Sequence, residues 1–74
     1  MNRFDLDHLF RYHSPTTEKQ GQYERIRAAA KEFAKVILEN SPASADQSVA
    51  VRNIREAVMN ANAAIALDGR QFIE

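Results

Sequence analysis

The stretch from Phe10 to Pro15 gathers three ring side chains and an arginine directly before a proline. The whole chain has four phenylalanines, two tyrosines and no tryptophan, so this grouping of Phe10, Tyr12 and His13 is dense. A tyrosine near a helix start commonly buries its ring at the edge of a core and leaves its hydroxyl in water. An exposed aromatic face stacks instead on a nucleobase of any identity. The residue types leave both interpretations of Tyr12 open. In either case His13 and Pro15 would shape the edge of the surface that Tyr12 presents.

A second candidate group follows at helical spacing. Tyr23, Arg27 and Lys31 are four residues apart, so on a helix they lie in one inclined row beside the expected packing seam. A seam-flanking arginine commonly extends its stem over apolar surface and pairs with a glutamate. Its guanidinium fork also fits phosphate oxygens. Both interpretations of Arg27 stay open at this point, and we assign Phe10, Phe33 and Met59 to packing.

No pattern of residues indicates catalysis or a bound metal. The chain has no glycine-rich phosphate loop, no HExxH pair and no nucleophile elbow. It has no cysteine, and its two histidines, His8 and His13, are too few for a zinc site. We therefore expect a protein that is not an enzyme and that uses no cofactor or metal.

Charge and hydropathy limit the classes of partner. Ten basic and ten acidic residues give a net charge of zero, which disfavours binding to long nucleic acid. A small anionic ligand needs only a local basic pocket. The N-terminus carries no apolar signal region, and the longest apolar run, Ala63 to Leu67, cannot span a membrane. These features favour the cytoplasm and no membrane association.

The spacing of apolar residues predicts two long helices in one domain that covers residues 1–74. Apolar positions recur at alternating intervals of three and four, which is the pattern of a packed helical seam. They are Tyr23, Ile26, Ala30, Phe33 and Ile37, and then Val51, Ile54, Val58, Ala61 and Ile65. The expected helices run over about 17–40 and 44–68, with Thr17 and Ser44 starting capping boxes and Gly69 as the C′ stop. A short loop between them makes an antiparallel hairpin, preceded by a short helical segment within about 3–13, so the fold class is all-α.

Apolar surface is left over once the two seams are paired. Ala50, Ala57 and Ala64 form a column beside the second seam, and Ala29 and Val36 form one beside the first. The second helix also becomes apolar nearly all round toward its end, which predicts burial against more than one partner helix. A single hairpin would leave this surface in water, so we expect a homo-oligomer.

The ordered residues of the chain also resemble a known family, the small phage anti-CBASS sponge proteins. The resemblance spans about Phe10 to Ala66. The residues that carry it are Phe10, Tyr12, His13, Pro15, Gln20, Tyr23, Ile26, Arg27, Ala34, Ile37, Pro42, Ser44, Ala50, Glu56, Ala57 and the run from Ala61 to Ala66.

The resemblance implies a function and roles for particular residues. Members of this family are helical hairpins that assemble into homo-oligomers, typically hexamers, and hold a cyclic dinucleotide between two protomers. They sequester the messenger in the host cytoplasm without cleaving it, and so block activation of the CBASS effector. The family's base-stacking aromatic falls on Tyr12 and its phosphate-binding residue on Arg27. His13, Pro15, Tyr23 and Lys31 complete the expected ligand-binding set.

Two departures from the family pattern stand out, and the second of them concerns a second pocket. Asn60 stands where the family often has tryptophan, and Leu67 stands where it tends to have arginine. Some members use a basic residue near that point to bind cyclic trinucleotides, so Leu67 puts this second activity in question. Arg70 could substitute, although it lies beyond the expected helix end.

Two alternatives remain beside the cyclic dinucleotide sponge. Similar hairpins act as sponges for a cyclic ADP-ribose signal of Thoeris defence. From a different class, the chain could be a non-enzymatic helical adaptor that binds a protein. The adaptor predicts no affinity for nucleotides and no effect of Tyr12→Ala.

Overall fold

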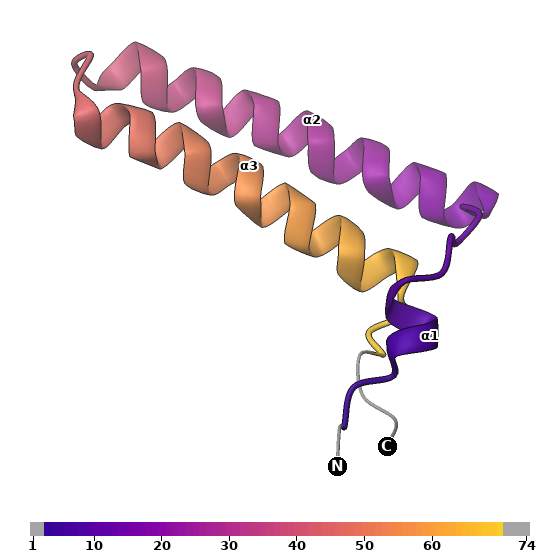
Figure 1. Cartoon of the computed structure of the whole chain (residues 1–74). Helices are drawn as coiled ribbons and strands as arrows, with labels where there is room; N and C mark the ends of the chain where they lie inside the picture. The colour runs from indigo at the N-terminus through magenta and orange to yellow at the C-terminus, as the bar shows by residue number, and fades with distance from the viewer. Residues whose placement is uncertain (1–2, 71–74) are drawn as a thin grey trace.

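The computed structural model describes residues 3–70, and its regular elements are three helices (Figure 1). Helix α1 spans Leu6–Leu9, α2 spans Thr17–Asn40 and α3 spans Ala45–Ala66. The two long helices lie side by side and antiparallel, and α1 lies at the open end of the hairpin, beside the end of α3. The predicted all-α hairpin with a short N-terminal helical segment is thus confirmed for the described residues.

Helix α2 begins at a different cap from the predicted one. Thr16, not Thr17, is the N-cap, and its hydroxyl accepts a hydrogen bond from the Lys19 backbone N–H at 3.1 Å. Thr16 has extended backbone angles, as an N-cap requires, whereas Thr17 is already helical. Gln20 therefore lies one position too far along the helix to complete a capping box, and that prediction was wrong.

The turn between the long helices is closed by side chains. Ser44 is the N-cap of α3 as predicted, and its hydroxyl accepts from the Gln47 backbone N–H at 3.1 Å. The Gln47 amide donates to the Ser41 carbonyl at 2.9 Å instead of returning to Ser44. Ser41 in turn donates to the Ile37 carbonyl at 2.6 Å. These bonds satisfy polar groups at both helix ends and fix the antiparallel pairing.

Helix α3 ends two residues before the predicted boundary at residue 68. Its C-cap is Leu67, and the Gly69 N–H donates to the Ala64 carbonyl at 2.8 Å while the Asp68 N–H donates to the Ile65 carbonyl at 3.2 Å. This pair of bonds is a Schellman motif. The left-handed C′ residue is Asp68, with φ 53°, rather than the expected Gly69, which follows with φ 72°. The prediction was therefore wrong by one residue.

A single hairpin buries very little. Within residues 3–70 only His8 and Leu67 are buried, each with 7% of its surface exposed. Phe10 is 84% exposed, and Phe33 and Met59 are more than half exposed, so a single chain does not bury them and their assignment to packing stays a prediction. In a two-helix hairpin, each helix buries one face against the other. The remaining apolar faces stay exposed to water.

Candidate ligand-binding site

Tyr12 lies in the segment between α1 and α2, and it is 81% exposed. No hydrogen bond or ring contact holds its side chain among residues 3–70. The ring therefore does not cover a core edge in this chain. It offers an aromatic face to solvent, which is what stacking on a flat ligand requires.

The residues on either side of Tyr12 are held by α1. The His13 ring nitrogen Nε2 is 2.7 Å from the His8 carbonyl oxygen, and Arg11 Nη2 is 3.3 Å from His8 Nδ1. The two imidazole rings meet edge to face with centroids 4.6 Å apart. His13 is half-buried, while Pro15 is exposed at the entrance to α2. The exposed tyrosine thus stands on a fixed backbone.

Tyr23, Arg27 and Lys31 lie on three successive turns of α2, as their spacing predicts. Tyr23 is half-buried, whereas Arg27 and Lys31 are exposed. Neither cation takes part in an ion pair within residues 3–70, where the pairs are Lys19 with Asp68 and Arg70 with Asp5. The glutamate partner that one interpretation gave to Arg27 is therefore not found in the described part of the chain.

The candidate residues do not form one pocket within a single chain. Arg27 is ten residues into α2, which places it about 15 Å along the helix axis from Thr17. No hydrogen bond or ring contact joins Tyr12 to Tyr23 or Arg27 among the described residues. Within residues 3–70, no direct contact therefore joins the aromatic segment to the cations of α2.

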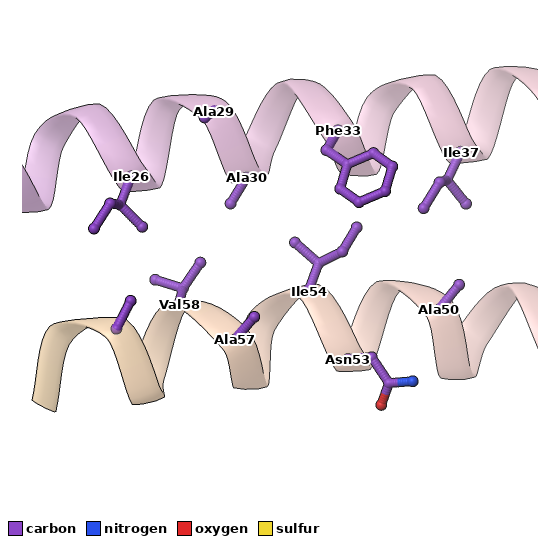
Figure 2. A pocket seen from close by; sticks show the side chains of 11 residues that line it. Ile26, Ala29, Ala30, Phe33, Ile37, Ala50, Asn53, Ile54, Ala57 and Val58 are labelled. Atoms are coloured by element: carbon purple, nitrogen blue, oxygen red, sulfur yellow. The ribbon is translucent and has the colours of Figure 1, made fainter. Parts of the chain in front are cut away.

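An apolar groove runs along one side of the hairpin (Figure 2). In this view Phe33 and Ile54 point toward each other across the groove, whereas Asn53 points away from α2. The lining residues are Ile26, Ala29, Ala30, Phe33, Ile37, Ala50, Asn53, Ile54, Ala57, Val58 and Ala61. Small residues along the groove would let another helix approach closely, so the groove fits a helical partner better than a charged ligand.

The region of the proposed second pocket has a different role in this chain. The Leu67 side chain is buried, and Arg70 Nη2 lies 3.4 Å from Asp5 Oδ2. An arginine held by a carboxylate is less available to a phosphate. Neither residue therefore supports a cyclic trinucleotide pocket in the isolated protomer.

Sequence reasoning missed three polar residues at the open end of the hairpin. They are His8, which contacts the end of α3, and the ion pair of Lys19 with Asp68 at 3.0 Å. The Lys19 hydrogen bond and charge lower the pKa of Asp68 below its ordinary value of 3.8. Contacts between residues so far apart in the chain produce no periodic pattern in the sequence. In the sequence, His8 was considered only as a metal ligand. In residues 3–70 no group of three or more His, Cys, Asp or Glu residues could hold a metal ion.

Comparison with known proteins identifies a family. The family model described as the Acb2/Tad1 hairpin domain matches residues 1–66, which is most of the chain. No curated protein and no solved structure gives a significant match to this sequence. In the described residues, no helix combines the length and the apolar character needed to cross a bilayer.

Proposed function

This chain belongs to the Acb2/Tad1 hairpin family of anti-CBASS and anti-Thoeris sponges, and we propose that it sequesters a cyclic dinucleotide messenger of CBASS. The family binds its signals and does not cleave them. The observation that supports a nucleotide ligand is an exposed aromatic face, Tyr12, on an anchored segment, together with the guanidinium of Arg27, which forms no ion pair within residues 3–70.

The chemistry of the ligand corresponds to these two groups. A cyclic dinucleotide has two flat bases and two phosphates. Tyr12 would stack on a base, and Arg27 would donate two hydrogen bonds to phosphate oxygens. Lys31, one turn further along α2, adds a second positive charge, and Tyr23 borders Arg27 on the other side. His13 and Pro15 would shape the edge that Tyr12 presents.

An oligomer would supply the remaining surface. Because the isolated protomer buries only His8 and Leu67 among its described residues, its apolar groove needs a cover. A second copy of the hairpin offers the same small and apolar residues. Related by a two-fold axis, two protomers would present two tyrosines and two arginines to a ligand with near two-fold symmetry. We propose a hexamer built from such dimers, acting in the host cytoplasm.

A cyclic ADP-ribose signal of Thoeris is the second candidate ligand, because the matched family covers both kinds of sponge. Such a signal also has a flat base and a pyrophosphate, so Tyr12 and Arg27 suit it as well. The difference between the two candidates is the number and spacing of bases. Only a direct comparison of ligands separates them.

Native mass spectrometry with a mixed ligand panel tests the proposal. The panel contains cyclic di-AMP, cyclic di-GMP, cyclic GMP-AMP, a cyclic triadenylate and a cyclic ADP-ribose isomer. We expect a hexamer that retains a cyclic dinucleotide at a fixed stoichiometry. After denaturation, the released ligand should have its original mass.

Each other outcome selects a different function. Retention of the cyclic ADP-ribose isomer alone would assign the protein to Thoeris. Release of a cleaved product would indicate an enzyme. A folded protein that retains no ligand of the panel would contradict the sponge and favour the protein-binding adaptor.

A further inference from the structure

We infer that His8 is a positioning residue that holds the Tyr12 segment against the end of α3, and that protonation of His8 releases this segment. The link to ligand affinity rests on the proposed function. The structural link does not, and it can be tested without a ligand. His8 is one of two buried residues in the described chain, and the family resemblance gives it no role.

The first contact of His8 is with the far end of the chain. His8 Nε2 lies 3.0 Å from the carbonyl oxygen of Leu67, the C-cap of α3. A carbonyl oxygen only accepts, so Nε2 carries the hydrogen. The bond ties α1 to the end of α3 across 59 residues of sequence, and it is a second bond to this carbonyl oxygen, which also accepts from the Arg70 N–H at 2.9 Å.

The second contact fixes the state of the other ring nitrogen. Arg11 Nη2 lies 3.3 Å from His8 Nδ1, and a guanidinium only donates. Nδ1 must therefore hold a lone pair. Together the two contacts require a neutral imidazole with its hydrogen on Nε2.

The third contact uses the backbone of the same residue. The His8 carbonyl oxygen accepts from His13 Nε2 at 2.7 Å. Arg11 and His13 are the two neighbours of Tyr12, and both side chains end on His8. The position of Tyr12 therefore depends on His8, although the tyrosine side chain itself makes no hydrogen bond or ring contact within residues 3–70.

Protonation of His8 would reverse one of these contacts. A hydrogen on Nδ1 would point at the Arg11 guanidinium, replacing a hydrogen bond by repulsion between two cations. His13 is a second imidazole in ring contact that can also become charged. Imidazole is the side chain whose unperturbed form changes its charge between about pH 5 and 8.

The nearby carboxylates already have partners. Asp5 accepts from the His8 backbone N–H at 3.2 Å and pairs with Arg70 at 3.4 Å. Asp68, whose charge also acts on His8, pairs with Lys19 at 3.0 Å. Within residues 3–70, neither carboxylate forms an ion pair with the His8 ring. The expected result is a looser segment around Tyr12 and weaker ligand binding in mild acid.

The ligand-free test follows amide hydrogen exchange of Leu9 and Phe10, whose N–H groups donate to the Asp5 and Leu6 carbonyls, by NMR at pH 8 and pH 5.5, after correction for the intrinsic rate. We expect protection in the wild type to fall at pH 5.5. His8→Gln, whose amide can donate to Leu67 and accept from Arg11 but cannot titrate, should remove this fall. His13→Gln should leave the fall in place. A fall that persists in His8→Gln, or that disappears only in His13→Gln, would overturn the inference.

The ligand-bound test uses calorimetry with whichever of cyclic di-AMP, cyclic di-GMP and cyclic GMP-AMP binds the wild type most tightly. Wild-type affinity should weaken roughly tenfold from pH 8 to pH 5.5. His8→Leu should weaken binding at pH 8. His8→Gln should restore most of the lost affinity and should make the affinity nearly independent of pH.

If His8→Leu does not fold, the dependence of affinity on pH in His8→Gln still decides. A dependence equal to that of the wild type would contradict the inference. If no dinucleotide binds the wild type, the proposed function fails, whereas the exchange experiment still decides the role of His8.

Discussion

Lys19 Nζ lies 3.0 Å from Asp68 Oδ1, so one ion pair joins the first turn of α2 to the residue that ends α3. Asp68 has φ 53°, a left-handed backbone that an aspartate tolerates better than most residues. The pair closes the open end of the hairpin, opposite the turn held by Ser44 and Gln47. Because Asp68 is well exposed, we expect a modest, salt-sensitive contribution to stability.

Asp68→Asn should change the response of the protein to acid. The Lys19 hydrogen bond lowers the pKa of Asp68 in the folded state below 3.8, so the stabilisation is present above that value and is lost as the pH falls through the folded pKa. The wild type should therefore have the higher Tm at pH 7, and its advantage over Asp68→Asn should shrink as the pH is lowered below 3.8. Thermal unfolding of both proteins from pH 7 to pH 2 measures this. An advantage that grows in acid would contradict the pairing.

Replacing each of the two glycines by alanine should change the stability of the fold in opposite directions. Gly69 has φ 72°, so Gly69→Ala should destabilise the fold by roughly 1–2 kcal/mol through the backbone alone, since no atom lies within 4 Å of the added Cβ. Gly21 is helical, and Gly21→Ala should stabilise by about 0.5–1 kcal/mol. Denaturant unfolding gives both values. A synthetic chain with D-alanine at position 69 is the control, and it should unfold like the wild type or later.

Tyr12→Ala should separate binding from folding. The ring is 81% exposed, so its removal should leave Tm and helix content nearly unchanged. Loss of one stacked base should weaken binding by about 1–3 kcal/mol, and Tyr12→Phe should keep most of the affinity. Calorimetry with the retained ligand and circular dichroism report the two properties. A Tyr12→Ala protein with wild-type affinity would exclude Tyr12 from the site.

Arg27→Ala should weaken binding by about 1.5–3 kcal/mol, because a charge-assisted phosphate contact is lost. Arg27→Lys should recover part of this loss, since an ammonium keeps the charge but not the fork. Arg52→Ala is the matched control, an exposed arginine of α3 outside the proposed site. Should Arg27→Ala break the oligomer instead, Arg27 would be an interface residue.

Ala57→Glu should dissociate the oligomer. Ala57 lines the apolar groove, so a carboxylate there would have to be buried against the covering protomer. Ala63→Glu places the same charge on an exposed position of α3 outside the groove and should leave the assembly intact. Analytical ultracentrifugation compares the two. Equal masses for both variants would mean that the groove is not the interface.

The sequence by itself determined the helices of this protein. Apolar residues at intervals of three and four, with Ser44 and Pro42 between them, are local signals, and they define α2 and α3 because each helix must place one stripe against the other. The ordered residues from Phe10 to Ala66 also identified the family, which the match over residues 1–66 confirms. These features depend on spacing along the chain, and spacing is what a sequence records.

Only the tertiary structure decided what lies at the open end of the hairpin. The contacts of His8 with Leu67 and of Lys19 with Asp68 join residues from opposite ends of the chain, and no local pattern encodes them. The left-handed position also lies at Asp68 and not at Gly69, and Asp68 pairs there with Lys19 of α2. The exposure of Tyr12 likewise depends on how its neighbours are held in place. Those contacts cannot be read from the sequence alone.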